Sequence, residues 1–192
     1  MRIGLVLVLL LAVAPTAATP ARETLLIDSA TAQARFALRA LWVKRIDGGF
    51  AQVQGVIERD TGTGRFDVDV RIAAGSIVMS NPDHAEWARS DDFFDATRHP
   101  WIGFRAEAQP EHVLRDGGDL VGELTLRGVT RPMRFEVEPA GCPRPGIDCA
   151  VRAFGELERS EFGMTARRLF ISDKVKLELA IRVHPATLPD AP

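Results

Sequence analysis

The side chains best suited to acid–base chemistry gather between Asp91 and His99. Asp91, Asp92 and Asp95 precede His99, and carboxylate and imidazole groups are the usual proton carriers of enzymes. Carboxylates near a helix start more simply accept hydrogen bonds from free backbone N–H groups and favour the positive end of the helix. We therefore expect the three aspartates to cap a helix, and we expect no catalytic residue. The alternative is an enzyme that uses His99 with Asp95, or one of the arginines described below.

Metal binding and covalent catalysis have weaker support. His84 and Glu86 follow Asp83, but a His-x-Glu pair without a third placed ligand is a poor predictor of a metal site. No Ser or Cys has the strand-turn-helix context of a catalytic nucleophile, and Ser160 is expected to be a turn residue. The sequence predicts no metal and no cofactor.

Two arginine pairs are the candidates for contact with a polar head group. Arg127 and Arg131 flank Gly-Val-Thr, and Arg167 and Arg168 precede Leu-Phe. Guanidinium groups bind phosphate and other oxygen-rich groups well. The plainer alternative is that all four are solvated surface charges, as most arginines are.

Aromatic side chains gather in the segment Trp87–Phe104, which contains five of them. The polar stretch at residues 80–83, with Pro82 near the first helical position, predicts the start of a short helix that leads into this segment. Pro100 disfavours helix at the residue before it, and apolar and polar residues alternate from Trp101 onwards. We expect a short helix that carries rings and leads directly into a strand, as a lid or plug against a β-sheet.

Most of the chain after residue 22 alternates with a period of two, which is typical of half-buried strands. Residues 66–72 show this most clearly, and 174–184 form a long last strand. Gly48-Gly49 predicts a turn. The other expected strands include 25–27, 36–40, 53–57, 101–109, a short one at 112–114, 120–126, 132–137 and 150–158. This pattern predicts an antiparallel barrel of about eight strands, whose interior is either filled or holds one small ligand.

The beginning of the chain predicts export. Arg2 precedes an apolar run, and small residues follow up to Ala18, as in a secretory signal peptide. The run is too short to cross a bilayer comfortably, so an uncleaved anchor is the less favoured alternative. We expect a signal peptide at 1–18, one domain at 19–184, a loose tail at 185–192, and a periplasmic or secreted location. The net charge of −2, with no basic block, argues against nucleic-acid binding.

The two cysteines, Cys142 and Cys149, lie in a segment that contains two prolines and a glycine. An oxidising compartment favours a disulfide that staples this loop. A redox pair is the alternative, although the spacing is not C-x-x-C.

Three segments, in this order, resemble the YceI family over about residues 24–184. They are Asp91-Asp-Phe-Phe-Asp95 with Arg98-His-Pro100 and Ile102-x-Phe104; Gly122-x-Leu-Thr-Leu-Arg-Gly-Val-Thr-Arg-Pro132; and Leu157-x-Arg159-Ser-x-Phe-Gly-Met164 with Ile171-Ser-Asp173-x-Val175. Many relatives have a histidine where this chain has Ala40, and the cysteine loop lies outside the family pattern.

The resemblance implies an exported, lipocalin-like, extended barrel with one or two short helices. It also implies a hydrophobic ligand held inside, such as an isoprenoid quinone or a polyprenyl phosphate, and a homodimer is left open. The residues expected to line its cavity are Phe36, Leu38, Phe66, Val68, Val70, Trp87, Phe93, Phe94, Trp101, Ile102, Phe104, Leu124, Phe135, Phe162, Met164, Leu177 and Leu179. A barrel with a filled interior would instead indicate an interaction or stress protein without a ligand.

Overall fold

Alternating side chains give the strands of this protein one buried and one wet face. The computed structural model describes residues 22–41 and 43–186, so the expected signal peptide and most of the expected tail lie outside the described residues. In β5 (Arg65–Ala73), Phe66, Val68 and Val70 are buried while Arg65 and Asp67 are exposed. The expected alternation of residues 66–72 is confirmed.

The described residues form one antiparallel sheet of twelve strands with two short helices. The sheet order is β12-β1-β4-β5-β7-β8-β9-β10-β11-β2-β3-β6. Besides β5, the elements are β1 (Arg22–Ile27), β2 (Gln33–Ala40), β3 (Lys44–Phe50), β4 (Val53–Asp60), β6 (Ile77–Met79), α1 (Pro82–Arg89), β7 (Trp101–Pro110), α2 (His112–Asp116), β8 (Gly118–Leu126), β9 (Val129–Val137), β10 (Val151–Glu158), β11 (Lys174–Ile181) and β12 (Val183–Pro185), with 3₁₀ turns η1 (Ala74–Ser76) and η2 (Arg159–Phe162).

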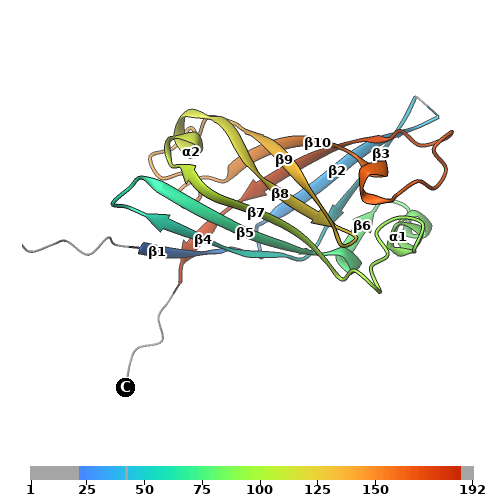
Figure 1. Ribbon diagram of the computed structural model, residues 1–192, viewed down its shortest axis with the longest axis horizontal. Helices are drawn as coiled ribbons and strands as arrows, with labels where there is room; N and C mark the ends of the chain where they lie inside the picture. The colour runs from blue at the N-terminus through green and yellow to red at the C-terminus, as the bar shows by residue number, and fades with distance from the viewer. Residues whose placement is uncertain (1–21, 42, 187–192) are drawn as a thin grey trace, which may run out of the picture.

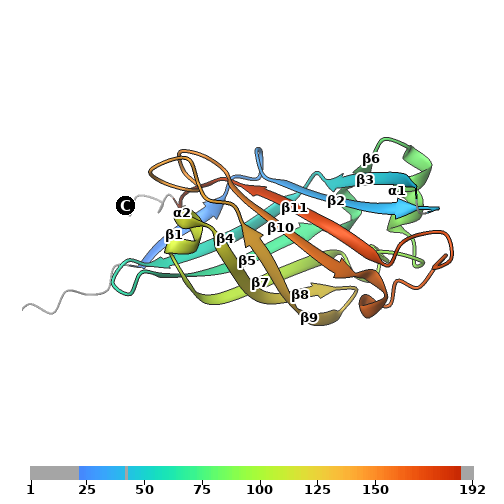
Figure 2. The same ribbon diagram turned by 90° about the horizontal axis from the view of Figure 1, so that it is seen from above.

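The sheet is strongly curled into an elongated half-barrel (Figures 1 and 2). The expected last strand is divided at Arg182 into β11, which pairs with β10 and β2, and β12, which pairs with β1. One stretch of chain therefore contacts strands from distant parts of the sheet order. The helices α1 and α2 lie at opposite ends of the half-barrel (Figure 1).

Two expectations about local structure were wrong. Gly48 and Gly49 do not form a turn but lie within β3. A Cβ atom on Gly48 would lie 2.3 Å from Cζ of Phe36, so the glycine leaves room for a ring on the neighbouring strand. The strand expected at 112–114 is the helix α2. The sheet has more strands than the eight or so expected, because β3 and β6 were not expected and the expected last strand is two strands, β11 and β12.

The helix expected near Pro82 is confirmed as α1. The side chain of Asn81 accepts a hydrogen bond from the backbone N–H of Asp83, and Pro82 occupies the first turn. The expected capping role of the aspartates 91, 92 and 95 was wrong, because α1 ends at Arg89 and turns follow it. Asp92 accepts from Nε1 of Trp87 at 3.2 Å.

The disulfide is present and closes the loop between β9 and β10. Cys142 and Cys149 are bonded, with their Cα atoms 6.2 Å apart. Within this loop the carbonyl of Gly146 accepts a hydrogen bond from the N–H of Val183 at 2.8 Å. The disulfide therefore closes the loop, and this hydrogen bond holds the loop against β12 at the α2 end of the sheet.

Candidate functional site

The inward faces of the strands enclose an apolar cavity of about 140 Å³ at the α1 end, called here the main cavity. Strands from most of the sheet and the side chains of α1 contribute to its wall. Three rings form a cluster at one side: the centroids of Phe36 and Phe94 are 6.0 Å apart, and Phe50 lies 5.8 Å from Phe36 and 5.4 Å from Phe94. An apolar, aromatic wall of this kind suits a hydrophobic ligand.

Most residues expected to line a cavity are found on the wall of the main cavity. These are Phe36, Leu38, Val70, Trp87, Phe93, Phe94, Ile102, Phe104, Leu124, Phe135, Met164, Leu177 and Leu179. Trp101 and Phe162 are not on this wall. The Trp101 side chain is 45% exposed at the beginning of β7, and Phe162 is buried in the core cluster beside η2.

A second cavity of about 70 Å³ lies towards the α2 end of the same interior. Its wall contains Phe66 and Val68, which were also expected to contact ligand. Val70, Phe104 and Leu179 line both cavities. The two cavities are therefore neighbours that share part of their walls.

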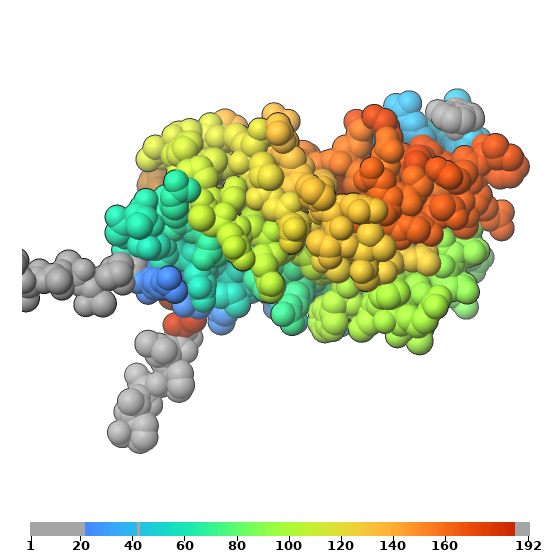
Figure 3. Space-filling model, in the orientation of Figure 1, coloured from blue at the N-terminus to red at the C-terminus, as the bar shows by residue number. Residues whose placement is uncertain are grey.

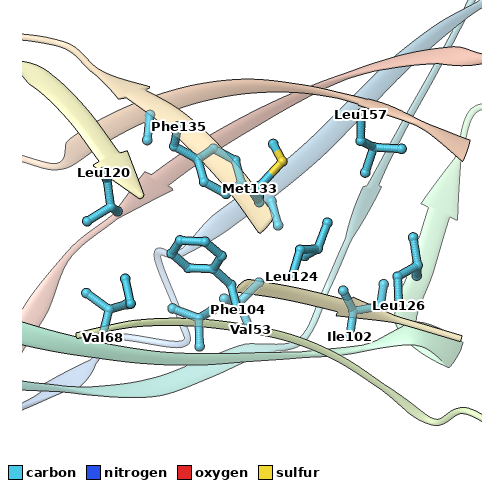
Figure 4. Packing of buried hydrophobic residues seen from close by; sticks show 14 of the residues in the cluster. Val53, Val68, Ile102, Phe104, Leu120, Leu124, Leu126, Met133, Phe135 and Leu157 are labelled. Atoms are coloured by element: carbon cyan, nitrogen blue, oxygen red, sulfur yellow. The ribbon is translucent and has the colours of Figure 1, made fainter. Parts of the chain in front are cut away.

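A pair of rings lies where the two cavities meet: Phe104 lines both cavities, and Phe135 lines the main cavity. Phe104 and Phe135 meet edge to face, with centroids 5.1 Å apart. Figure 4 shows these rings facing each other, with Val68 and Leu120 to one side and Ile102, Leu126 and Leu157 to the other. We call the pair Phe104 and Phe135 the partition.

Glycines on adjacent strands make room for the partition. A Cβ atom on Gly122 would lie 2.9 Å from Cζ of Phe104, and one on Gly155 would lie 2.9 Å from Cδ1 of Phe135. Both rings therefore lie close against the sheet, a position that any larger residue at these two sites would obstruct.

Arg159 is a buried cation on the wall of the main cavity, and the sequence analysis did not identify it as a site residue. Its side chain is only 1% exposed, and its guanidinium lies 5.7 Å from the centroid of the Phe93 ring. Burial lowers the pKa of Arg159 below its ordinary value, and the nearby carboxylate of Asp173 opposes that shift. The ordinary pKa of arginine is so high that the group remains charged at neutral pH.

Backbone carbonyls of the loop before β11 hold this cation. Arg159 donates to the carbonyl oxygens of Ser172 at 3.0 Å, Met164 at 2.6 Å and Ile171 at 3.2 Å. A guanidinium has five N–H groups. Among the described residues, the hydrogen bonds found for Arg159 therefore use three of its five donors.

The four arginines expected to contact a head group lie outside both cavity walls. Arg127 donates to the carbonyl of Phe93, and Arg131 is exposed on β9. Arg167 lies over the ring of Trp87, 4.7 Å from its centroid. Arg168 pairs with Asp173 at 3.7 Å. Arg127 and Arg167 each contact a residue of the main cavity wall, Phe93 and Trp87 respectively.

The polar residues that do line the main cavity are Arg35, His84 and Arg159. Sequence reasoning also missed apolar wall residues on β3, namely Ile46 and Phe50. Their alternation with Gly48 between them was visible in the sequence, but the glycine pair was interpreted as a turn.

The residues considered for acid–base chemistry stand outside the cavity walls. Asp95 is 4% exposed and pairs with Nη2 of Arg98 at 2.7 Å, while Nε2 of His99 is 3.9 Å from the same carboxylate. Neither Asp95 nor His99 belongs to the wall of either cavity. In residues 22–41 and 43–186, no three or more His, Cys, Asp or Glu side chains gather as a metal site requires.

Within the same described ranges, no helix has the length and apolar character needed to cross a membrane.

The fold and the cavities define a class: an antiparallel β half-barrel with an apolar, partly aromatic interior. The model of the YceI-like domain family matches residues 26–183, and the chain therefore belongs to this family. The resemblance seen in the three sequence segments is confirmed. Protein YceI of Shigella flexneri is 27% identical over 146 residues, which cover 69% of this chain and 74% of that protein.

Two solved structures share the fold. BcnA of Burkholderia cenocepacia superimposes with a TM-score of 0.64 at 17% identity, over 82% of this chain and 99% of that one. A polyisoprenoid binding domain from Saccharophagus degradans, implicated in plant cell wall breakdown, superimposes with a TM-score of 0.62 at 14% identity, over 85% of this chain and 99% of that one.

Proposed function

We propose that the protein is an exported binding protein for a long isoprenoid lipid, such as an isoprenoid quinone or a polyprenyl phosphate, with its tail inside the half-barrel. The observation that carries this proposal is the apolar wall of the main cavity, with its three-ring cluster of Phe36, Phe50 and Phe94. The disulfide Cys142–Cys149 is consistent with an oxidising compartment and supports export. The relationship to a polyisoprenoid binding domain agrees with the proposal.

The size of the main cavity constrains how a tail is held. A cavity of about 140 Å³ is close to the volume of about 150 Å³ that accommodates a single benzene ring in another protein. A tail of several isoprene units therefore extends beyond the main cavity, and we propose that part of it occupies the neighbouring second cavity. The partition has to yield for this to happen, by rotation of Phe104 or Phe135 or by separation of the strands.

The energy for such a movement comes from the tail itself. Each Å² of apolar surface removed from water contributes about 25 cal/mol, less the cost of ordering the tail. An isoprenoid tail is large, so its burial can offset the displacement of one ring from its packed position.

The head group is proposed to lie at the α1 end, where the polar residues of the main cavity are found. In this proposal the remaining N–H groups of Arg159 and the imidazole of His84, both from the wall of the main cavity, contact a phosphate or a quinone oxygen. Of the four arginines expected from the sequence, Arg167, stacked on the wall residue Trp87, is the one that we propose assists. Arg127, Arg131 and Arg168 are not part of this proposal.

Native mass spectrometry of protein purified from its own cells tests the proposal. We expect a bound mass that organic extraction releases as a lipid with an isoprenoid tail. The Phe104→Asp variant places a carboxylate in the apolar interior and should lose this mass. A matched control is Glu107→Asp, which changes an exposed residue on the same strand. Wild-type protein that yields no lipid on extraction would contradict the proposal.

The two alternatives have less support. The first alternative, an enzyme based on His99 and Asp95, would act outside both cavity walls. The second, an interaction or stress protein with a filled interior, disagrees with the presence of two cavities. Recovery of an unchanged lipid after long incubation, in wild-type protein and in His99→Ala alike, would argue against the enzyme.

A further inference from the structure

Large apolar side chains project into solvent at one end of the protein. Val43 is 87% exposed, Leu169 82%, Leu41 59% and Phe170 56%. Leu41 and Val43 belong to the β2–β3 hairpin, and Leu169 and Phe170 belong to the loop before β11. We call these four residues the apolar tip. Figure 3 shows the hairpin in light blue and the loop in orange side by side at one end of the molecule.

Backbone hydrogen bonds join the two loops into one surface. The N–H of Leu41 donates to the carbonyl of Phe170 at 2.7 Å, and the N–H of Ser172 donates to the carbonyl of Arg39 at 2.8 Å. Ala40 and Ile171 form an antiparallel bridge between these contacts. The apolar tip is thus a fixed arrangement of two segments that are more than a hundred residues apart in the sequence.

Cations surround the apolar tip. Residues 39–45 contain Arg39, Lys44 and Arg45 and no acidic residue, and residues 163–172 contain Arg167 and Arg168 and no acidic residue. This positive cluster belongs to a chain whose net charge is −2.

The acidic neighbours of these cations are few. Arg45 pairs with Asp47 at 2.5 Å, and Arg168 with Asp173 at 3.7 Å. Arg39 and Arg45 are directly opposite each other on β2 and β3, and both are exposed. Like charges in that position repel each other, so an external anion would stabilise this surface.

The position of the tip links it to the cavity. Leu38, Ile46 and Ile171 line the main cavity, and each is at most three residues from a member of the apolar tip. A partner that covers the tip would therefore lie beside the wall of the main cavity.

We propose that the apolar tip docks on a bilayer that contains anionic phospholipid. Leu41, Val43, Leu169 and Phe170 enter the interfacial region, and the surrounding cations contact the lipid head groups. Apolar side chains beside basic ones are the combination that holds peripheral proteins at such surfaces. Docking itself does not depend on the proposed function. Its role does rest on that function, because docking would bring the main cavity to the bilayer from which lipid is taken up or to which it is released.

A bilayer fits this surface better than a protein does. Stable protein interfaces bury about 20–30 residues on each side and have few charges at their centre. The tip offers four apolar side chains on two loop ends, with five basic residues in the same two segments. That geometry suits shallow insertion between mobile head groups.

Sedimentation with vesicles tests the proposal on the exported form of the full chain. The probe is a vesicle of equal parts phosphatidylglycerol and phosphatidylcholine, compared with phosphatidylcholine alone at low salt. Wild-type protein should bind the anionic vesicles and be released as salt is raised. Val43→Asp with Leu169→Asp should weaken binding by about tenfold or more, because two inserted apolar side chains become charged.

Arg167→Glu with Arg168→Glu should weaken binding by about fivefold for each cation lost, or more. The control is Val121→Asp on β8, at a residue that is 48% exposed and outside the tip, and it should bind as the wild type does. Both tip residues changed in the first variant are highly exposed, so that variant should remain folded.

Three results would overturn the proposal: wild-type protein that fails to sediment with anionic vesicles, a double tip variant that sediments like wild type, or equal binding to neutral vesicles at all salt concentrations. Light scattering tests whether a second copy of the chain, instead of a bilayer, covers the apolar tip. A wild-type dimer that becomes monomeric in the tip variant, without vesicle binding, would assign the surface to a second copy of the chain.

Failure of this inference and failure of the proposed function can be told apart. Phe104→Asp changes the interior and should retain vesicle binding while it loses extracted lipid. Wild-type protein that binds vesicles but contains no lipid would remove the proposed function and leave the docking surface in place. A lipid-loaded protein that ignores vesicles would do the reverse.

Discussion

The two ends of the interior differ in how firmly they are held. At the α2 end, Arg59 lines the second cavity and pairs with Glu23 and Glu111, and the disulfide loop closes over β12. At the α1 end, rings form much of the wall, and the buried cation Arg159 holds the loop before β11. A disulfide and ion pairs thus join segments at one end, while ring packing and hydrogen bonds from arginines to backbone carbonyls hold the other. For the proposed binding function, this difference favours the α1 end as the place where a ligand enters.

Removal of the partition should have the largest effect. Phe104→Ala is expected to cost about 3–5 kcal/mol of unfolding free energy, because the ring is 6% exposed and packs against Phe135. It should also join the two cavities, so that longer tails are extracted from the folded variant. Urea unfolding and mass spectrometry of extracted lipid measure the two effects. Ile102→Val, a smaller change on the same strand, is the control, and an unchanged tail length would show that the partition does not limit the ligand.

Loss of the buried cation should disturb the α1 end strongly. Arg159→Met leaves the carbonyls of Met164, Ile171 and Ser172 without their donor, and each buried acceptor left unpaired costs about 1–3 kcal/mol. We expect a loss of about 3 kcal/mol or more, measured by urea unfolding. Hydrogen exchange should increase in residues 164–172 before it increases in β12. Arg168→Met, at an exposed ion pair, should cost less than about 1 kcal/mol.

The disulfide should matter mainly at the α2 end. Cys142→Ser with Cys149→Ser opens a loop whose cysteines are seven residues apart, and should cost about 2–3 kcal/mol. Hydrogen exchange is expected to rise near Val183, with the N–H of Leu41 at the other end unaffected. Equal increases at both ends would contradict the division of the molecule proposed above.

Glycine substitutions provide a finer comparison of the two halves. Gly55→Ala would place a Cβ 2.3 Å from the backbone oxygen of Asp69, whereas Gly48→Ala would meet the ring tip of Phe36 at 2.3 Å. A ring can shift into the main cavity, but a strand backbone cannot yield as easily. Both changes should cost about 1–3 kcal/mol, with Gly55→Ala the more damaging. Gly103→Ala, whose nearest atom is 4.0 Å away, serves as the control in thermal unfolding.

The smallest expected effect is a dependence of stability on pH through Asp173. Burial raises the pKa of this carboxyl, but hydrogen bonds from the hydroxyl and the backbone N–H of Ser160, together with the charges of Arg168 and Arg159, outweigh burial, so the pKa lies below its ordinary value. A depressed pKa stabilises the fold above the ordinary pKa near 3.8, and the benefit disappears as pH falls through the folded value. Ser160→Ala should therefore reduce the loss of stability between neutral and acidic pH, by less than about 1 kcal/mol. An unchanged pH profile would remove Asp173 from this role.

The positions of most strands could be predicted from the sequence, but the number of strands could not. Alternation located β5 correctly, and Asn81 with Pro82 marked the beginning of α1. The glycine pair in β3 was misread because a local rule ties such pairs to turns, while here the neighbouring ring of Phe36 determines the need for glycine. Contacts between strands that are distant in the sequence cannot be deduced from a single strand.

The same reason explains what was missed at the site. Inward-facing positions on β7 and β11 followed from alternation, so most wall residues could be expected. Trp101 has the right residue type but lies at the first position of its strand, where the side chain remains 45% exposed. Arg159 resembles any surface arginine until the loop 164–172 folds around it, because its partners are backbone carbonyls with no sequence signature.

The two edge strands of the sheet affect the tendency of the protein to aggregate at high concentration. The terminal strands, β12 and β6, have only three residues each. Short edges offer little backbone to an incoming strand, and β12 ends on Pro185, which has no N–H to donate. A sheet of twelve strands is thereby protected from edge-to-edge aggregation between copies of the protein.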